Sequence, residues 1–430
     1  MTEGSTTTKS SSNRRISRRT LGAAVAVLGM AAVVTLPAGV RAADEQVLVI
    51  NSDRSGAGQK AAMNKIAADF EARNPGVKVT INYSDVESYK TSIRNFLVTN
   101  PPDVAFWFTG ARMKTFTKRG LFEDMSGFFA ENQLTEVMKP WLPAVSEGDK
   151  QYMMPTNFTT WGFFYNKQVF EKVGVAPPAT WDELMDAAAK IKAAGVTPFS
   201  IGTRDLWANA LWFDYLNMRM NGLDFHMELM DGKASYTDPR VKAVFAKWGE
   251  PIGKGYFLDN ASSYGWQEAI PFLAQGRAAM YLLGPYVLTS LPADAHGNIG
   301  FFPFPVIDPS VPKAEEISVN GVTIPSRAKN KPLARSFLAF LAQPDNLKAF
   351  ALGGAVLPAR TDVDVSGDAF AQSQMDLARN AEGSAQFYDR DTDPEMAQVG
   401  MKGFQEFLAN PKRSDSVLER LETARQRIFK

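Results

Sequence analysis

The strongest constraint on the fold is a regular alternation of strand and helix patterns over residues 46–108. Residues 46–50 form a short apolar run, and residues 77–83 alternate apolar with polar side chains, as strands do. Residues 59–73 place apolar side chains at helical spacing and end before Asn-Pro-Gly. A further helix pattern leads to a third strand at residues 104–108. Strands separated by helices predict a mainly parallel sheet covered on both faces, which is an α/β fold.

The same alternation returns in the middle of the chain. Residues 161–165, 197–202 and 278–283 have strand patterns. Thr180, with a glutamate three residues later, forms a capping box that predicts the start of a helix. The tail from residue 369 to the C-terminus has mostly helical patterns. A chain of 430 residues is too long for one compact core, so we expect two domains.

The first 42 residues have the layout of an export signal. Several arginines precede an apolar run at residues 21–36, and small residues follow, with cleavage expected after Ala42. The run is shorter than the roughly 20 residues that a membrane span needs, so an uncleaved anchor is the less favoured alternative. Arg18 and Arg19 resemble a twin-arginine export address, while the general secretory route stays open.

The residue composition limits the chemistry that the chain can perform. Cysteine is absent, and His226 and His296 are the two histidines. A bacterial lipid anchor needs a cysteine at the cleavage site, so we expect the mature protein to be free in the periplasm. This composition argues against a zinc site and a Ser-His-Asp triad, and a net charge of +1 argues against nucleic-acid binding. We therefore expect no catalytic residue, metal or cofactor.

One motif points to a different class of protein. Residues 56–61 read Gly-Ala-Gly-Gln-Lys-Ala, the outline of a dinucleotide fingerprint, and Asp85 lies beyond the second strand. Residues 51–55 nevertheless separate the strand from this motif, whereas a dinucleotide site turns directly off its strand. An exported NADP-dependent oxidoreductase that uses residues 56–61 is the alternative hypothesis. The favoured interpretation is a turn that presents Asp53 and Ser55 at the mouth of a cleft.

Aromatic residues near predicted strand ends favour a carbohydrate ligand. Trp107 and Trp207 have polar neighbours, and ligands of open α/β sheets bind at the carboxyl ends of the strands. Sugars present C–H faces that stack on flat rings and hydroxyls that need paired donors and acceptors. A glycan-cleaving enzyme with an acidic pair is a further possibility, but spacing in the sequence cannot set the required separation of two carboxylates. We therefore rank reversible binding above catalysis.

Several segments share their order and spacing with one known family. They are Tyr-Met-Met-Pro at 152–155, Trp-Gly-Phe-Phe-Tyr-Asn-Lys at 161–167 and Pro-Ala-Thr-Trp-Asp-Glu-Leu at 178–184, with further similarities at residues 102–104, 272–286, 334–341 and 357–360. Together they resemble the family 1 extracellular solute-binding proteins, the sugar-capturing subunits of ABC importers. The resemblance implies the two-lobed periplasmic binding protein fold, with a ligand cleft between lobes that close like a hinged clamp.

The resemblance also implies lobe boundaries and ligand contacts. The first lobe would comprise residues 43–157 and 284–325, the second residues 158–283 and 326–430, with chain crossings near 155–159, 283–285 and 324–326. Trp107 matches a first-lobe tryptophan of the maltose binders, but Gly110 stands where they carry an aspartate, which puts maltose itself in doubt. The expected ligand-binding residues are Asp53, Ser55, Trp107, Thr109, Arg112, Phe158, Trp161, Trp207, Asn209, Trp266, Gly284, Tyr286, Asn320 and Arg360.

The charge of the ligand stays open. Arg54, Arg112, Arg204 and Arg360 lie near the expected cleft and would suit an anionic sugar, whereas surface arginines are the simpler explanation for each. The expected partners are a small carbohydrate and the membrane permease subunits of an ABC importer. We expect a monomer that needs no cofactor.

Overall fold

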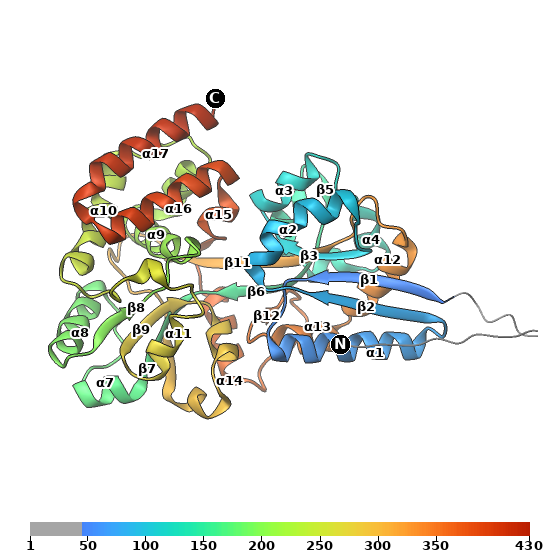
Figure 1. Cartoon of the computed structure of the whole chain (residues 1–430), viewed down its shortest axis with the longest axis horizontal. Helices are drawn as coiled ribbons and strands as arrows, with labels where there is room; N and C mark the ends of the chain where they lie inside the picture. Colours follow the sequence, from blue (N-terminus) through green and yellow to red (C-terminus); the bar gives the residue numbers. More distant parts are fainter. Residues whose placement is uncertain (1–44) are drawn as a thin grey trace, which may run out of the picture. The chain divides into compact units, whose positions relative to one another are not determined.

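The computed structural model describes residues 45–430, which form two large β-sheets covered by helices and a small two-stranded sheet (Figure 1). The predicted export signal at residues 1–42 lies outside the described residues, together with its cleavage site. No helix within residues 45–430 is long and apolar enough to cross a membrane.

The first lobe is built on a seven-stranded sheet that begins with the predicted parallel strands. β1 pairs in parallel with both β2 and β3, whereas β11 runs antiparallel to β3 and β6. The strand order is β12-β6-β11-β3-β1-β2, with β13 added beside β11. The strands are β1 (Gln46–Ser52), β2 (Val77–Tyr83), β3 (Val104–Phe108), β6 (Met154–Thr160), β11 (Ala314–Thr323), β12 (Leu357–Pro358) and β13 (Gly383–Ala385).

Helices cover both faces of this sheet, as the strand-helix alternation predicts. One face packs against α1, α12 and α13 through a core that includes Phe70, Phe106 and Phe337. The other face packs against α2 and α3, where Tyr89 and Trp107 are buried. Figure 1 shows α1 and α13 on the opposite side of β1 from α2. The bounds are α1 (Ala57–Arg73), α2 (Val86–Thr99), α3 (Ala111–Thr117), α12 (Lys331–Leu341), α13 (Pro344–Leu352) and α14 (Ala369–Arg379).

The second lobe is built on a four-stranded sheet with its own hydrophobic core. The strand order is β10 (Ile299–Phe302), β7 (Gly162–Asn166), β9 (Ala278–Leu283) and β8 (Thr197–Ser200). The predicted capping box is confirmed at α8, where the Thr180 hydroxyl accepts from the Glu183 amide. The helices are α7 (Lys167–Val173), α8 (Trp181–Ala193), α9 (Trp207–Met230), α10 (Pro239–Gly253), α11 (Ile270–Ala274), α15 (Tyr388–Asp391), α16 (Pro394–Ala409) and α17 (Ser414–Ile428).

The division of the chain between the two sheets differs from the predicted lobe boundaries. β6 of the first sheet leads directly into β7 of the second, close to the predicted crossing at residues 155–159. Residues 284–325 were expected in the first lobe, but β10 pairs with β7 of the second sheet. Residues 326–430 were expected in the second lobe, but α12, α13 and β12 belong to the first. Amphipathic spacing predicts that a helix packs on a sheet, but not which sheet it covers.

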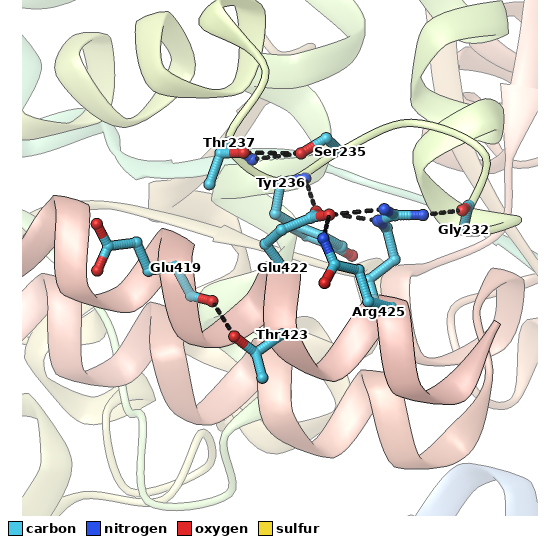
Figure 2. Close-up of polar contacts among 9 residues, drawn as sticks. Gly232, Ser235, Tyr236, Thr237, Glu419, Glu422, Thr423 and Arg425 are labelled. Atoms are coloured by element: carbon cyan, nitrogen blue, oxygen red, sulfur yellow. Dashed lines mark hydrogen bonds and ion pairs between the residues drawn. The ribbon is translucent and has the colours of Figure 1, made fainter. Parts of the chain in front are cut away.

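One carboxylate of the last helix forms a polar link to the second lobe (Figure 2). Glu422 of α17 accepts hydrogen bonds from the Tyr236 amide at 2.9 Å and from the Arg425 guanidinium. Arg425 also donates to the Gly232 carbonyl at 2.7 Å. Partial burial alone would raise the pKa of Glu422, but these hydrogen bonds lower it to about 2. The helix end is therefore held by a fully ionised group at neutral pH.

Candidate functional site

A cavity of about 480 Å³ lies among side chains from both lobes. This volume falls within the range of about 300–1,000 Å³ that is usual for small-molecule sites. Its lining comprises Asp53, Arg54, Ser55, Gly56, Gln59, Val86, Lys90, Phe108, Arg112, Asn157, Thr159, Trp161, Trp207, Trp266, Gln267, Tyr286, Thr289, Ser290, Asn320, Gly354, Val356, Phe387, Asp389 and Arg390.

The second lobe contributes an aromatic wall, which consists of Trp161, Trp207, Trp266, Tyr286 and Phe387. Their ring centroids lie 5.0–6.1 Å apart, with edge-to-face or tilted geometry. Such contacts hold each ring in a fixed orientation, because the positive edge of one ring meets the negative face of the next. The wall is therefore a rigid apolar platform rather than a set of mobile side chains.

Local backbone geometry positions two of these rings. Trp207 is the first residue of α9 and follows Leu206, whose φ of 66° is unusual for a residue with a side chain. The Asp205 carboxylate accepts from the Trp266 amide at 3.0 Å and so ties the two tryptophan segments together. Strain of this kind persists only where the surrounding structure enforces it, and it is concentrated at ligand sites.

The opposite wall, here called the charged wall, consists of Asp53, Arg54, Lys90, Arg112, Asp389 and Arg390. The four basic side chains surround the ring of Phe108, at 4.7–5.9 Å from its centroid. Arg112 pairs with Asp389, and the Arg54 Nε lies 3.2 Å from the Asp53 Oδ1. Basic groups outnumber acidic groups in this wall, so an anionic group of a ligand would be attracted to it.

The charges in this wall perturb one another. Burial lowers the pKa of Arg390 to about 10, and burial together with the charge of Arg112 lowers the pKa of Lys90. Burial by itself would raise the pKa of Asp389, but the charges of Arg112, Lys90 and Arg390 outweigh it and lower that pKa. Perturbed ionisable groups gathered beside a cavity are typical of a functional site.

Unpaired buried polar atoms line the same cavity. Both carboxylate oxygens of Asp53, which is 1% exposed, have no hydrogen-bond partner among the described residues. The same holds for the Trp207 Nε1 and the Asn320 Oδ1 within residues 45–430. A buried polar group left unpaired costs about 1–3 kcal/mol, so a polar ligand that pairs with these atoms would recover that free energy.

Strand register explains why three polar or aromatic side chains meet at one edge of the cavity. Asn320 of β11 lies directly opposite Phe108 of β3 on one side and Asn157 of β6 on the other. Directly opposed residues on neighbouring strands project from the same face of a sheet. All three therefore reach the cavity from consecutive positions across the sheet.

The structure brings part of the expected ligand set together. The expected residues that line the cavity are Asp53, Ser55, Arg112, Trp161, Trp207, Trp266, Tyr286 and Asn320. They come from both lobes, as the expected cleft requires.

Two expected aromatic residues lie on the wrong face of their strands. Trp107 is 3% exposed and packs against Tyr89 and Phe116 in the core beneath α2. Phe158 stacks on Trp141 in the core beneath α1. Side chains alternate between the two faces of a strand, so the neighbours of these two residues reach the cavity in their place.

Three other expected residues act as structural supports. The Thr109 hydroxyl lies 2.9 Å from the Val319 carbonyl, and the Asn209 amide donates to the Leu206 carbonyl at 3.0 Å. Arg360 is held by Asp362 and by a backbone carbonyl, away from the cavity. Arg204, which was considered for an anionic ligand, pairs with Glu268 on the surface instead.

Gly284 supports the aromatic wall instead of lining the cavity. A side-chain carbon at this position would lie 2.5 Å from the Tyr286 ring and 3.1 Å from the Thr159 methyl. The missing side chain therefore leaves the space that the Tyr286 ring occupies beside its own backbone.

Several lining residues were not anticipated. Lys90 lies on α2, for which the sequence predicted a helix but no ligand contact. Phe108 lines the cavity in place of Trp107, the adjacent residue that was predicted to do so. Phe387, Asp389 and Arg390 belong to a tail for which the sequence predicted helices but no site. Strand alternation could have identified Phe108, whereas nothing local to the tail indicates that it returns to the cavity.

The glycine motif at residues 56–61 has a packing role. α1 begins at Ala57, and a side-chain carbon at Gly58 would lie 2.2 Å from the Gly353 carbonyl oxygen. The motif thus permits α1 to approach the backbone that follows α13. Helix packing therefore accounts for the motif, and the oxidoreductase alternative is not supported.

Known proteins resemble this chain in both sequence and structure. A family model described as bacterial extracellular solute-binding protein matches residues 55–348. An ABC transporter extracellular-binding protein of Pyrococcus horikoshii is 25% identical over 318 residues, which are 71% of this chain and 70% of that protein. The multiple sugar-binding protein of Streptococcus mutans is 23% identical over 253 residues, covering 57% of this chain and 59% of that protein.

Solved structures share the fold over most of the chain. The bacterial solute receptor AcbH, described as having an exclusive preference for β-D-galactopyranose, superposes with a TM-score of 0.85 at 26% identity. That superposition covers 90% of this chain and 100% of the receptor. Maltose-bound MalE3 of T. maritima superposes with a TM-score of 0.75 at 19% identity, covering 89% of this chain and 99% of that one. The expected two-lobed fold is confirmed.

Proposed function

Since this chain belongs to the bacterial extracellular solute-binding proteins, we propose that it captures a sugar reversibly and delivers it to the membrane permease of an ABC importer. The sugar binds in the cavity between the aromatic wall and the charged wall. No covalent step is involved, and the protein works as a monomer after export from the cytoplasm.

The observation that carries this proposal is the meeting of three indole rings with unpaired buried polar atoms in one cavity. Trp161, Trp207 and Trp266 offer flat apolar faces, while Asp53 and Asn320 offer oxygens that lack donors among the described residues. A sugar has C–H faces that stack on the indole rings and hydroxyl groups that donate hydrogen bonds to the oxygens. Neither a purely apolar ligand nor a bare ion would satisfy both.

The comparisons support a sugar over other solutes. Proteins of similar sequence include sugar-binding proteins, and the similar structures include receptors described with galactopyranose, stachyose and maltose. The sequence similarity to any one of them is too low to transfer an individual sugar. The ligand class is therefore a carbohydrate, with its size and charge set by the two walls.

Ligand binding is coupled to movement of the lobes. The aromatic wall belongs to the second lobe, and most of the charged wall belongs to the first, so one sugar contacts both. A ligand that binds the closed form more tightly than the open form shifts the population towards closure. The closed form presents the surface that the permease recognises.

The test is calorimetry with the purified mature protein and a panel of D-galactose, maltose, stachyose and D-galacturonate. We expect at least one sugar to bind, and Asp53→Asn to weaken it by about 1.5–3 kcal/mol, because a charge-assisted hydrogen bond is lost. Arg204→Ala is the matched control, since Arg204 is exposed and lies outside the cavity. Equal weakening by both variants, or none by either, would place the site elsewhere.

A further inference from the structure

A second polar cluster lies between α9 of the second lobe and β11 of the seven-stranded sheet, away from the cavity lining. It consists of Asp214, His226 and Glu316, all of which are 0% exposed. One ligand-type atom from each residue lies within 4.8 Å of the others. Asp214 and His226 come from the two halves of α9, on either side of a break at Gly222, and Glu316 comes from β11.

The facing atoms of these three residues have no hydrogen-bond partner among the described residues. They are the Asp214 Oδ1, the His226 Nε2 and the two carboxylate oxygens of Glu316. The His226 Nε2 is aimed at the Asp214 Oδ1 from 4.0 Å, which is too long for a hydrogen bond. A buried carboxylate or imidazole in this state is costly, so the cluster needs an occupant that all three atoms can share.

The remaining atoms of the cluster are held by neighbours that fix its orientation. The Tyr388 amide donates to the Asp214 Oδ2 at 2.9 Å, and the His226 Nδ1 lies 3.1 Å from the Asn217 side-chain amide. Asn217 is held in turn by Asn221 at 2.8 Å. Such outer contacts orient ligand side chains in metal sites and leave the inner atoms open.

From this geometry we propose that Asp214, His226 and Glu316 bind one divalent transition-metal ion, such as Zn²⁺ or Mn²⁺. One imidazole nitrogen and two carboxylate oxygens form a donor set that suits these ions. The two carboxylate charges cancel the charge of the ion, so the buried site becomes neutral. In tetrahedral geometry, bonds of about 2.0–2.2 Å place ligand atoms roughly 3.4 Å apart, so the side chains have to move inward by about an ångström or slightly more when the ion binds.

Without an ion, burial disfavours the charged form of each side chain in the cluster. Burial raises the pKa of Asp214 and of Glu316, which shows how costly two uncompensated carboxylates are here. A proton held between the two carboxyl groups is the competing occupant.

The position of the cluster gives the ion a structural task. Tyr388, which binds Asp214, stands between Phe387 and Asp389, and both of these line the sugar cavity. Glu316 lies on the strand that continues to Asn320, another lining residue. An ion at this point would therefore brace the inner side of the cavity wall from three separate segments.

The experiment uses the full mature protein, unfolded in denaturant with a chelator and refolded with Zn²⁺, with Mn²⁺ or with chelator alone. Refolding is needed because fully buried ligand atoms do not exchange metal freely in the folded state. We expect roughly one ion per chain by elemental mass spectrometry and a higher melting temperature in the metal-refolded protein. Wild-type protein that retains no metal under any of these conditions overturns the proposal.

Variants separate a metal from a shared proton. His226→Gln and Glu316→Gln should abolish metal retention, whereas His296→Gln, which changes the other histidine of the chain, should keep it. If a proton is the occupant, Glu316→Gln leaves the melting temperature unchanged or raises it, and no sample holds metal. Should the His226 variant fail to fold, the metal content of the wild type and of the His296 variant still decides the question.

Discussion

The two walls of the cavity solve different parts of the binding problem. The aromatic wall is neutral, and its rings hold one another at 5.0–6.1 Å, so its shape changes little when a ligand enters. The charged wall holds buried groups such as Asp53, which is ion-paired with Arg54 but accepts no hydrogen bond from a described residue. The aromatic wall therefore supplies apolar contact to any sugar, whereas the charged wall determines which sugar is bound.

The largest expected effect tests which face of β3 lines the cavity, the face with Phe108 or the face with Trp107. Trp107→Ala should lower the free energy of unfolding by about 3–5 kcal/mol, because it removes a fully packed indole from the core. Phe108→Ala should also lower stability, since Phe108 is buried, but it should in addition weaken sugar binding. Denaturant titration and calorimetry on both variants measure the two effects, and reversed results would move Trp107 into the site.

The next effect isolates the aromatic wall. Trp207→Ala should weaken sugar binding by about 2 kcal/mol or more, roughly 30-fold, as is usual for a central aromatic contact. Trp207→Phe keeps the apolar face but removes the unpaired indole N–H, so it should cost about 1 kcal/mol. Calorimetry that finds both variants equal would mean that the ring face contributes nothing beyond its N–H.

A smaller effect isolates the charged wall. Lys90→Met should weaken the binding of a sugar acid such as D-galacturonate about tenfold, while a neutral sugar should change much less, because one of the four cations around Phe108 is lost. Raised salt should reduce the wild-type affinity for the acid in the same sense. Equal losses for acid and neutral sugar would show that Lys90 acts as a hydrogen-bond donor rather than as a charge.

The smallest effect is a flat pH profile for neutral sugars. Arg390 has a pKa of about 10, Asp389 has a lowered pKa, and burial raises the pKa of Tyr286 well above its usual value. Arg390 therefore stays protonated, Asp389 stays ionised and Tyr286 stays neutral between about pH 6 and 9. Affinity that changes more than about twofold over this range would indicate that another group contacts the sugar.

The sequence predicted the elements that local patterns determine, but not the pairing of segments that are distant in the sequence. Alternating strands and helices predicted the parallel arrangement of β1, β2 and β3, and a capping box predicted the start of α8. The assignment of β10 and α12 to lobes was not predictable, because it depends on long-range pairing that leaves no local trace.

The site shows the same contrast on a smaller scale. Trp161 and Trp207 were predicted from aromatic residues at strand ends, and both line the cavity. Trp107 and Phe158 were predicted to line the cavity, but residues next to them on the same strands do so instead. Both strands are buried on both faces, so no alternation of polar and apolar side chains shows which face meets the cavity. Arg390 reaches the site only through the packing of α15, which sequence spacing cannot show.

The missing side chain at Gly284 has a consequence for how this receptor could change its ligand preference. A single methyl group at that position would collide with the ring of Tyr286 and push it towards the bound solute. A change in selectivity could thus arise from a residue that never touches the cargo. Swapping Gly284 for alanine would reshape the pocket from behind, with every contacting side chain left chemically intact.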